Sequence, residues 1–157
     1  MMDKLNVEKL LQDLKDPSEE IRKVATTKLW QSWFEQKGEM GLRILINAGK
    51  YIELGQLEKA EELLTETIEQ QPDFAEAWNR RAIVYYVKKE YRKAKKDCQQ
   101  VVKLNPIHFG AWHGLGLSHG KLKEYIEAIA AFRKALEIQP HSLQNQRLLL
   151  EYTARLS

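Results

Sequence analysis

The chain has 157 residues, of which 43% are hydrophobic and 30% are charged, and its formal net charge is +3 at pH 7. This balance excludes intrinsic disorder, which requires a low apolar content or a large net charge, and it indicates a single folded domain. The one cysteine, Cys98, excludes an internal disulfide, and no apolar run approaches the roughly 18 residues that a membrane span requires.

The first ten residues, MMDKLNVEKL, mix charged and apolar side chains and lack the apolar stretch of a signal peptide. The sequence therefore predicts a cytoplasmic protein. The soluble phase of an organelle is the alternative if an upstream targeting segment is missing.

Residues 1–40 predict a helical hairpin. Residues 16–19 (DPSE) are typical of a helix start, with a capping side chain, proline at the first helical position and acids near the positive end of the helix dipole. The helix that follows is amphipathic, because Ile21, Ala25, Leu29 and Trp33 recur on one face. A shorter helix with Leu10 and its neighbours comes before it.

We expect this hairpin to cap the repeats that follow it, with Trp30 and Trp33 packed on the first helix of the first unit. In the alternative interpretation these two tryptophans form a secondary surface that anchors a partner. Large exposed apolar patches are unusual on monomers, and this favours packing.

From residue 41 onward the sequence repeats at one fixed interval. Pro72, Pro106 and Pro140 stand at this interval, and so do Trp78 and Trp112. Small and aromatic residues keep the same step: Ala60, Ala94 and Ala128; Ala48, Ala82 and Gly116; Tyr51, Tyr85 and His119. A period of about 34 residues predicts helical units that bury their apolar faces only by stacking, with an exposed inner surface available for binding.

Within each unit the apolar residues recur at helical intervals, so each unit is predicted to be two amphipathic helices. The small residues let paired helices approach closely, and each proline ends the second helix. Gly55 is predicted to form the turn between the helices of the first unit. Cys98 lies on the apolar stripe of its helix, which indicates a core residue instead of a nucleophile.

The repeated residues resemble the tetratricopeptide repeat family, and the resemblance covers residues 41–142. The third unit fits best, through Trp112, Leu115, Gly116, Ala128, Phe132, Ala135 and Pro140. The second unit differs at Arg81 and Cys98, and the first unit differs at Ile44, Asn47 and Thr67.

The resemblance implies an all-α fold, a right-handed α-solenoid of antiparallel helix pairs. Its predicted parts are the hairpin of residues 1–40, three units at 41–74, 75–108 and 109–142, and a capping helix at 143–157. Together they would form one tetratricopeptide repeat domain.

In this family the first helix of each unit lines an inner, concave groove that binds a peptide or a helix. Carried over by position, the predicted groove residues are Leu45, Ile52, Asn79, Arg80, Ile83, Tyr86, His113, Leu117 and Lys121. Gly49, Gly110 and Gly114 fall on the same face and would leave room for a ligand backbone. The alternative is that Asn79 and Arg80 bond neighbouring turns, and that the chain's own ends or a second copy fill the groove.

One branch of the family binds the acidic C-termini of chaperones through lysine, asparagine and arginine side chains. The corresponding places here hold Leu45, Gly49, Arg80, Gly110 and Gly114, so this resemblance argues against a chaperone-tail adaptor. Arg81 points toward the packed side, where a charge needs a partner, and we expect an ion pair or hydrogen bonds with Asp97 or Asn47.

Charge is uneven along the repeats. Residues 41–74 carry seven acids and three bases, whereas residues 75–108 carry three acids and nine bases. The basic run favours a nucleic-acid partner only weakly, because an extended basic face with interleaved exposed aromatics is missing. Adjacent acidic and basic units could equally favour contacts between copies of the chain, so a self-associating structural element stays open.

Nothing in the sequence indicates catalysis, a cofactor or a metal. No two of the four histidines, His108, His113, His119 and His141, share a helical face at the i, i+4 spacing that a zinc site requires. The glycines of GLGLSHG lack both the spacing and the preceding strand of a dinucleotide loop. The sequence therefore predicts a protein-interaction module, an adaptor, scaffold or assembly factor, which is not an enzyme.

Overall fold

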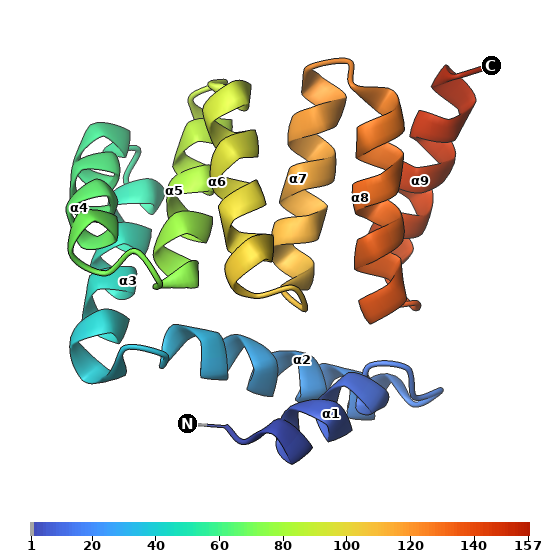
Figure 1. The fold of residues 1–157 in the computed structure, drawn as a ribbon, viewed down its shortest axis with the longest axis horizontal. Helices are drawn as coiled ribbons and strands as arrows, with labels where there is room; N and C mark the ends of the chain where they lie inside the picture. The colour runs from blue at the N-terminus through green and yellow to red at the C-terminus, as the bar shows by residue number, and fades with distance from the viewer. Residues whose placement is uncertain (1) are drawn as a thin grey trace.

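The computed structural model describes residues 2–157, and this part of the chain forms nine α-helices without a β-strand (Figure 1). Their bounds are α1 Lys4–Asp13, α2 Glu19–Phe34, α3 Gly38–Glu53, α4 Leu57–Gln70, α5 Ala75–Val87, α6 Tyr91–Leu104, α7 Phe109–Lys121, α8 Tyr125–Ile138 and α9 Leu143–Arg155. The predicted all-α helical repeat fold is confirmed. Among the described residues, no helix is long and apolar enough to cross a membrane.

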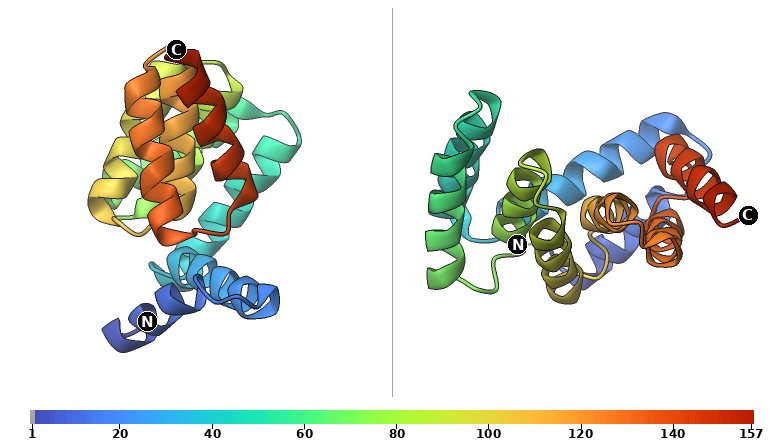
Figure 2. Two further views of the ribbon diagram at one scale, coloured as in Figure 1. Left: turned by 90° about the vertical axis from the view of Figure 1, so that its right-hand side faces the viewer. Right: turned by 90° about the horizontal axis from the view of Figure 1, so that it is seen from above.

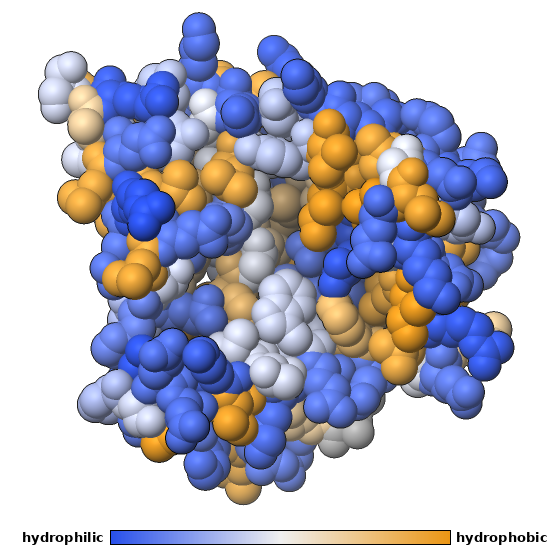
Figure 3. Space-filling model, turned by 180° about the vertical axis from the view of Figure 1, so that it is seen from behind, coloured by the Kyte–Doolittle hydropathy of each residue, from blue (hydrophilic) through white to orange (hydrophobic). Residues whose placement is uncertain are grey.

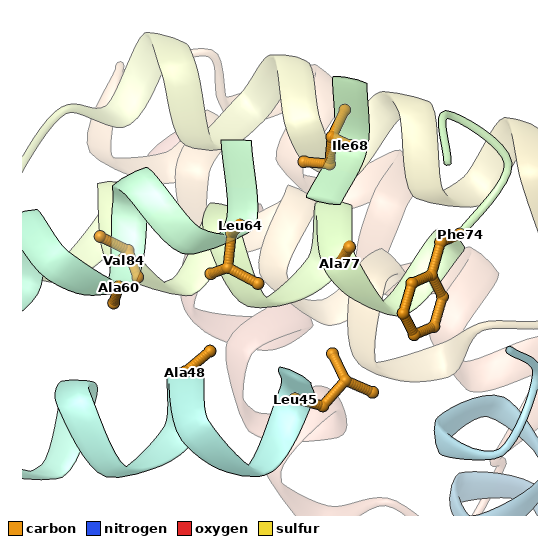
Figure 4. Packing of buried hydrophobic residues seen from close by; sticks show 8 residues of the cluster. All are labelled: Leu45, Ala48, Ala60, Leu64, Ile68, Phe74, Ala77 and Val84. Carbon is orange, nitrogen blue, oxygen red and sulfur yellow. The ribbon is translucent and has the colours of Figure 1, made fainter. Parts of the chain in front are cut away.

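Helices α3 to α9 stand side by side as a row of antiparallel neighbours (Figure 1). Leu45 and Ala48 of α3, Leu64 of α4 and Val84 of α5 meet in the core of the first two pairs (Figure 4). Their apolar faces recur at helical spacing, so successive pairs bury a continuous core. Cys98 is buried in the next cluster, and burial raises the pKa of its thiol to about 12, so its assignment to the core is confirmed.

The turn inside each pair uses one left-handed residue. Gly55, Lys89 and Lys123 have φ angles of 73°, 63° and 63°, and they hold the same place in successive repeats. The predicted turn at Gly55 is thus confirmed, and two lysines take the same conformation in the later units. Only glycine adopts this region without steric cost.

The turns between the pairs are held by a repeated hydrogen bond. The indole nitrogens of Trp78 and Trp112 donate to the backbone oxygens of Pro72 and Pro106, at 2.9 and 2.7 Å. Gln146 donates in the same way to the oxygen of Pro140, at 2.7 Å. Helix α9 therefore begins as the first helix of a further pair would.

The N-terminal hairpin lies beneath this row, along the lower ends of its helices (Figures 1 and 2). Helix α2 starts at Ser18, whose side chain accepts from the backbone N–H of Ile21, so Pro17 precedes the cap and is not the first helical residue. Helix α2 and the residues just after it meet three successive turns. Thr26 lies by Gln139 and Trp33 by His108 within α2, and Gln36 and Lys37, just past its end, lie by Asp73. The hairpin thus bridges all three proline-containing turns.

The expectation that Trp30 and Trp33 pack on the first helix of the first unit is wrong. Both rings instead pack on His108 and Phe109, at the start of α7. The physical reason is that the free edge of α3 is polar. Arg43, Asn47 and Lys50 are exposed there, at the repeat places that Ala77, Arg81 and Val84 hold in the second unit. That edge needs no apolar cover, and α2 binds the turns instead.

We predict opposite effects for two alanine substitutions at glycines that have no neighbouring atom within 4 Å of an added Cβ. Gly55→Ala should lower the free energy of unfolding by about 1 kcal/mol, because alanine is strained at its positive φ. The matched control, Gly49→Ala inside α3, should raise it by up to about 1 kcal/mol. Urea unfolding measures both changes, and equal effects would contradict the assigned turn geometry.

Candidate functional site

The candidate groove is on the face formed by the first helix of each pair. Seen from above, α5 and α7 lie behind α6 and α8 (Figure 2), so they form the face away from the viewer of Figure 1. This face is hollowed in its middle (Figure 3), and weakly polar and apolar side chains lie within a more polar surround. The predicted groove residues lie on helices α3, α5 and α7.

The predicted groove residues differ in their accessibility. Ile83 and Lys121 are exposed, whereas Leu45 and Asn79 are buried with exposed fractions of 4% and 5%. The remaining five are half-buried: Ile52, Arg80, Tyr86, His113 and Leu117. A ligand that leaves the fold unchanged can therefore touch seven of the nine residues.

One line of the face is apolar across three units. Gly49, Ile83 and Leu117 hold the same repeat place on α3, α5 and α7. Nothing lies within 4 Å of the point where a Cβ on Gly49 would stand, so the backbone is open there. Tyr86 lies nearby on α5, and its ring meets Tyr91 edge-on at 5.3 Å.

A buried polar pair lies at the end of the same face where α5 and α7 begin. Glu76 of α5 and His108, the N-cap residue of α7, are both fully buried, and the Nε2 of His108 contacts a carboxylate oxygen of Glu76. The Nδ1 of His108 accepts from the backbone N–H of Ala111 at 3.0 Å, so the ring proton lies on Nε2 and is donated to Glu76. The pair fixes α5 against α7.

The hairpin covers the imidazole of this pair. The Trp33 ring stacks on His108 with the ring centroids 4.2 Å apart, and Trp30 meets the same imidazole edge-on at 5.1 Å. Trp30 also fills the space over Gly110, where an added Cβ would collide with its ring. Gly110 is therefore not open to a ligand backbone, and the chain's own hairpin covers this end of the face.

Arg80 and Asn79 are tied to the same network. The guanidinium of Arg80 lies 4.8 Å over the Phe34 ring, and its Nε is 3.6 Å from Glu76. The amide of Asn79 lies 3.5 Å from the Glu76 carboxylate. His113 is also engaged, because its Nδ1 lies 2.7 Å from the side-chain oxygen of Asn145 on α9.

Sequence reasoning missed the central role of Glu76. A glutamate in the first turn of a helix is explained by the helix dipole, and nothing in its spacing indicates burial. His108 gave no signal either, since the proline turn before it accounts for its position. The repeat comparison alone could have raised the question, because the third unit has Gly110 at the place of Glu76.

The predicted partner of Arg81 is confirmed. Its guanidinium donates to both carboxylate oxygens of Asp97 at 2.7 and 2.9 Å, and to the hydroxyl of Thr65 at 3.2 Å. Burial raises the pKa of Asp97, and the hydrogen bonds from Arg81 oppose that shift. The two short bonds from a permanently charged group make an ionised pair.

Two hollows flank the hairpin. One, of about 580 Å³, lies where the hairpin meets the ends of α5 and α6, between Trp33, Gln36, Asp73 and Leu104. The other, of about 480 Å³, lies between the start of α2 and the turn before α9. In residues 2–157 no three histidine, cysteine, aspartate or glutamate side chains converge in a metal-binding arrangement.

Comparison with known proteins places these features in context. The sequence profile of the tetratricopeptide repeat matches residues 75–108 and 110–142. A TPR repeat-containing protein of Rhizobium etli is 32% identical over 108 residues, which cover 68% of this chain and 53% of that protein. The human superkiller complex protein 3 is 30% identical over 95 residues, 59% of this chain and 6% of that protein. The chain thus spans about half or less of the length of these curated relatives.

Solved structures share the fold. The first TPR domain of Spaghetti (RPAP3), bound to the HSP90 peptide SRMEEVD, superposes with a TM-score of 0.71 at 23% identity, covering 73% of this chain and 91% of that one. The TPR domain of Sgt2 from Aspergillus fumigatus gives a TM-score of 0.68 at 22% identity, covering 73% and 77%. At these sequence identities the comparison shows a shared fold only.

We predict that Arg81→Leu lowers the free energy of unfolding by about 3 kcal/mol, because it leaves the Asp97 carboxylate buried without its partner. The double variant Arg81→Leu, Asp97→Leu should recover most of this loss, since apolar side chains often replace a buried ion pair at little cost. Urea unfolding of the three proteins measures both effects. A double variant that is less stable than the single one would contradict the pairing.

Proposed function

Because the chain belongs to the tetratricopeptide repeat family, we propose that it is a protein-interaction module that binds a peptide or helix in the groove of α3, α5 and α7. The observation that carries the proposal is the apolar line of Gly49, Ile83 and Leu117 on the hollowed face. The family and the fold are typical of interaction modules and not of enzymes. An adaptor, scaffold or assembly factor in the cytoplasm, or in the soluble phase of an organelle, fits this activity.

The accessible chemistry favours an apolar ligand face. Ile83 is 38% exposed and Val87 52% exposed on α5, and Ile46 is 50% exposed on α3. Lys121, at the far end of α7, is a cation near this line that has no ion-pair partner among residues 2–157, and its ammonium lies 5.9 Å from the centre of the Tyr91 ring. Arg80 instead lies against Glu76 and Phe34. We therefore propose an amphipathic helix or an apolar peptide segment as the ligand.

The same argument disfavours an acidic chaperone tail. Domains of this fold bind the HSP90 peptide SRMEEVD and the HSP70 peptide SGPTIEEVD in solved complexes. Four of the five places that would grip such a carboxylate hold Leu45, Gly49, Gly110 and Gly114, which offer no side-chain donor. Trp30 also covers one of these places in the groove, Gly110.

The proposal predicts that amphipathic helical peptides selected from a display library will bind the wild type through the apolar line. Ile83→Glu should weaken them at least about tenfold, since a buried charge replaces an apolar contact worth about 1.4 kcal/mol or more. Fluorescence anisotropy with labelled peptides measures the affinity.

The matched control is Ile126→Glu on α8, which makes the same change at an exposed isoleucine on the opposite side of the helix pairs. Binding should be unchanged in this variant. Loss of binding in Ile126→Glu with retention in Ile83→Glu would refute the groove. Saturable binding of SRMEEVD in preference to every apolar peptide would refute the ligand class.

A further inference from the structure

The second helices of the first two units carry opposite charge. Helix α4 has five glutamates and one lysine, and α6 has five basic residues and one aspartate. The third such helix, α8, has two acids and two bases. All three belong to the side of the molecule that faces the viewer in Figure 1, away from the groove (Figures 1 and 2). The contrast is therefore confined to the two neighbouring helices α4 and α6.

Some of these charged side chains form ion pairs within the molecule. Lys88 lies 2.8 Å from both Glu58 and Glu61, and Lys95 lies 2.9 Å from Glu124. Three acids of α4 and three bases of α6 are exposed and have no ion-pair partner among residues 2–157: Glu62, Glu66, Glu69, Arg92, Lys96 and Lys103. We call these two sets the acidic row and the basic row.

The two rows occupy matching places in the repeat. Glu62 and Lys96 stand one repeat period apart, and so do Glu69 and Lys103. Side chains at matching repeat places point to the same side of the solenoid, so both rows belong to one outer surface. That surface has an acidic half and a basic half whose net charges are equal in magnitude and opposite in sign.

We propose that this surface binds a second copy of the chain, with the acidic row of each copy against the basic row of the other. A half-turn exchanges the two halves, so the surface is its own complement, and the resulting pair is closed and does not extend into a filament. An unrelated partner would have to reproduce both rows, whereas a second copy supplies them. The groove stays open because it lies on the other side.

The geometry makes this a weak, reversible and salt-sensitive association. Each helix has 14 residues and is about 21 Å long, so the contact is smaller than a standard protein interface. Exposed ion pairs are individually weak and are screened by salt, so the dimer depends on all of its ion pairs together. Charge complementarity mainly sets which partner is chosen.

Sedimentation velocity over a range of protein concentrations tests the proposal. At about 10 mM salt, where the screening length is about 30 Å, the mean mass should rise with concentration from 18.4 kDa toward the dimer value. At about 1 M salt, with a screening length of about 3 Å, it should stay at the monomer value. A monomer under both conditions at every concentration would overturn the proposal.

Charge exchange identifies the surface. One triple variant makes the acidic row basic, Glu62→Lys, Glu66→Lys and Glu69→Lys, and the other makes the basic row acidic, Arg92→Glu, Lys96→Glu and Lys103→Glu. Each variant alone should be monomeric at low salt, because its two rows now have the same sign. An equal mixture of the two should associate again, and failure of the mixture to do so would overturn the proposal.

A third variant with three exposed hairpin acids reversed, Glu8→Lys, Glu20→Lys and Glu35→Lys, changes the net charge by the same amount as the first. It should associate like the wild type, and circular dichroism checks the fold of all variants. Loss of association in this control would overturn the assignment to α4 and α6. So would a wild-type monomer whose basic row instead binds a single-stranded oligonucleotide.

Discussion

The buried carboxylate of Glu76 is the constraint on which the arrangement of this molecule depends. A carboxylate without solvent contact is strongly unfavourable unless it is paired, so α5 must hold its side chain where His108 can donate to it. His108 in turn caps α7 and is covered by Trp33 of the hairpin. One buried polar group therefore fixes two repeat units and the N-terminal hairpin relative to each other.

This constraint also decides which part of the inner face can serve a ligand. The polar network of Glu76, His108 and Arg80 lies at the end of the face where α5 and α7 begin. Trp30 packs over Gly110 there, and Phe34 packs against Arg80. Arg80, which holds one of the five places compared with the carboxylate-binding branch of the family, has its Nε 3.6 Å from Glu76 and its guanidinium over the Phe34 ring. What remains open is the apolar line through Ile83, so in the proposed binding mode the hairpin would restrict a ligand to this part of the groove.

The structural features that depend on the repeat period could be predicted from the sequence. This is because stacked repeats pack through residues at matching places in successive units. The helix pairs, the turn at Gly55, the core position of Cys98 and the Arg81–Asp97 pair all follow from that period. The placement of the hairpin does not, since residues 1–40 share no period with the units and their apolar face fits more than one surface. The buried state of Glu76 was likewise hidden, because its partner His108 is covered by Trp33, which belongs to the hairpin and lies outside the repeats. For the candidate groove, the period indicated a face, and only the structure showed which of its residues are accessible.

Native-state hydrogen exchange of Trp33→Ala tests the central role of the hairpin most directly. If α2 holds the two units together through the buried pair, amides in the first turns of both α5 and α7 should lose protection together, while those of α4 and α8 keep it. Loss of protection confined to α1 and α2 would contradict the account, because the solenoid would then hold its arrangement without the hairpin.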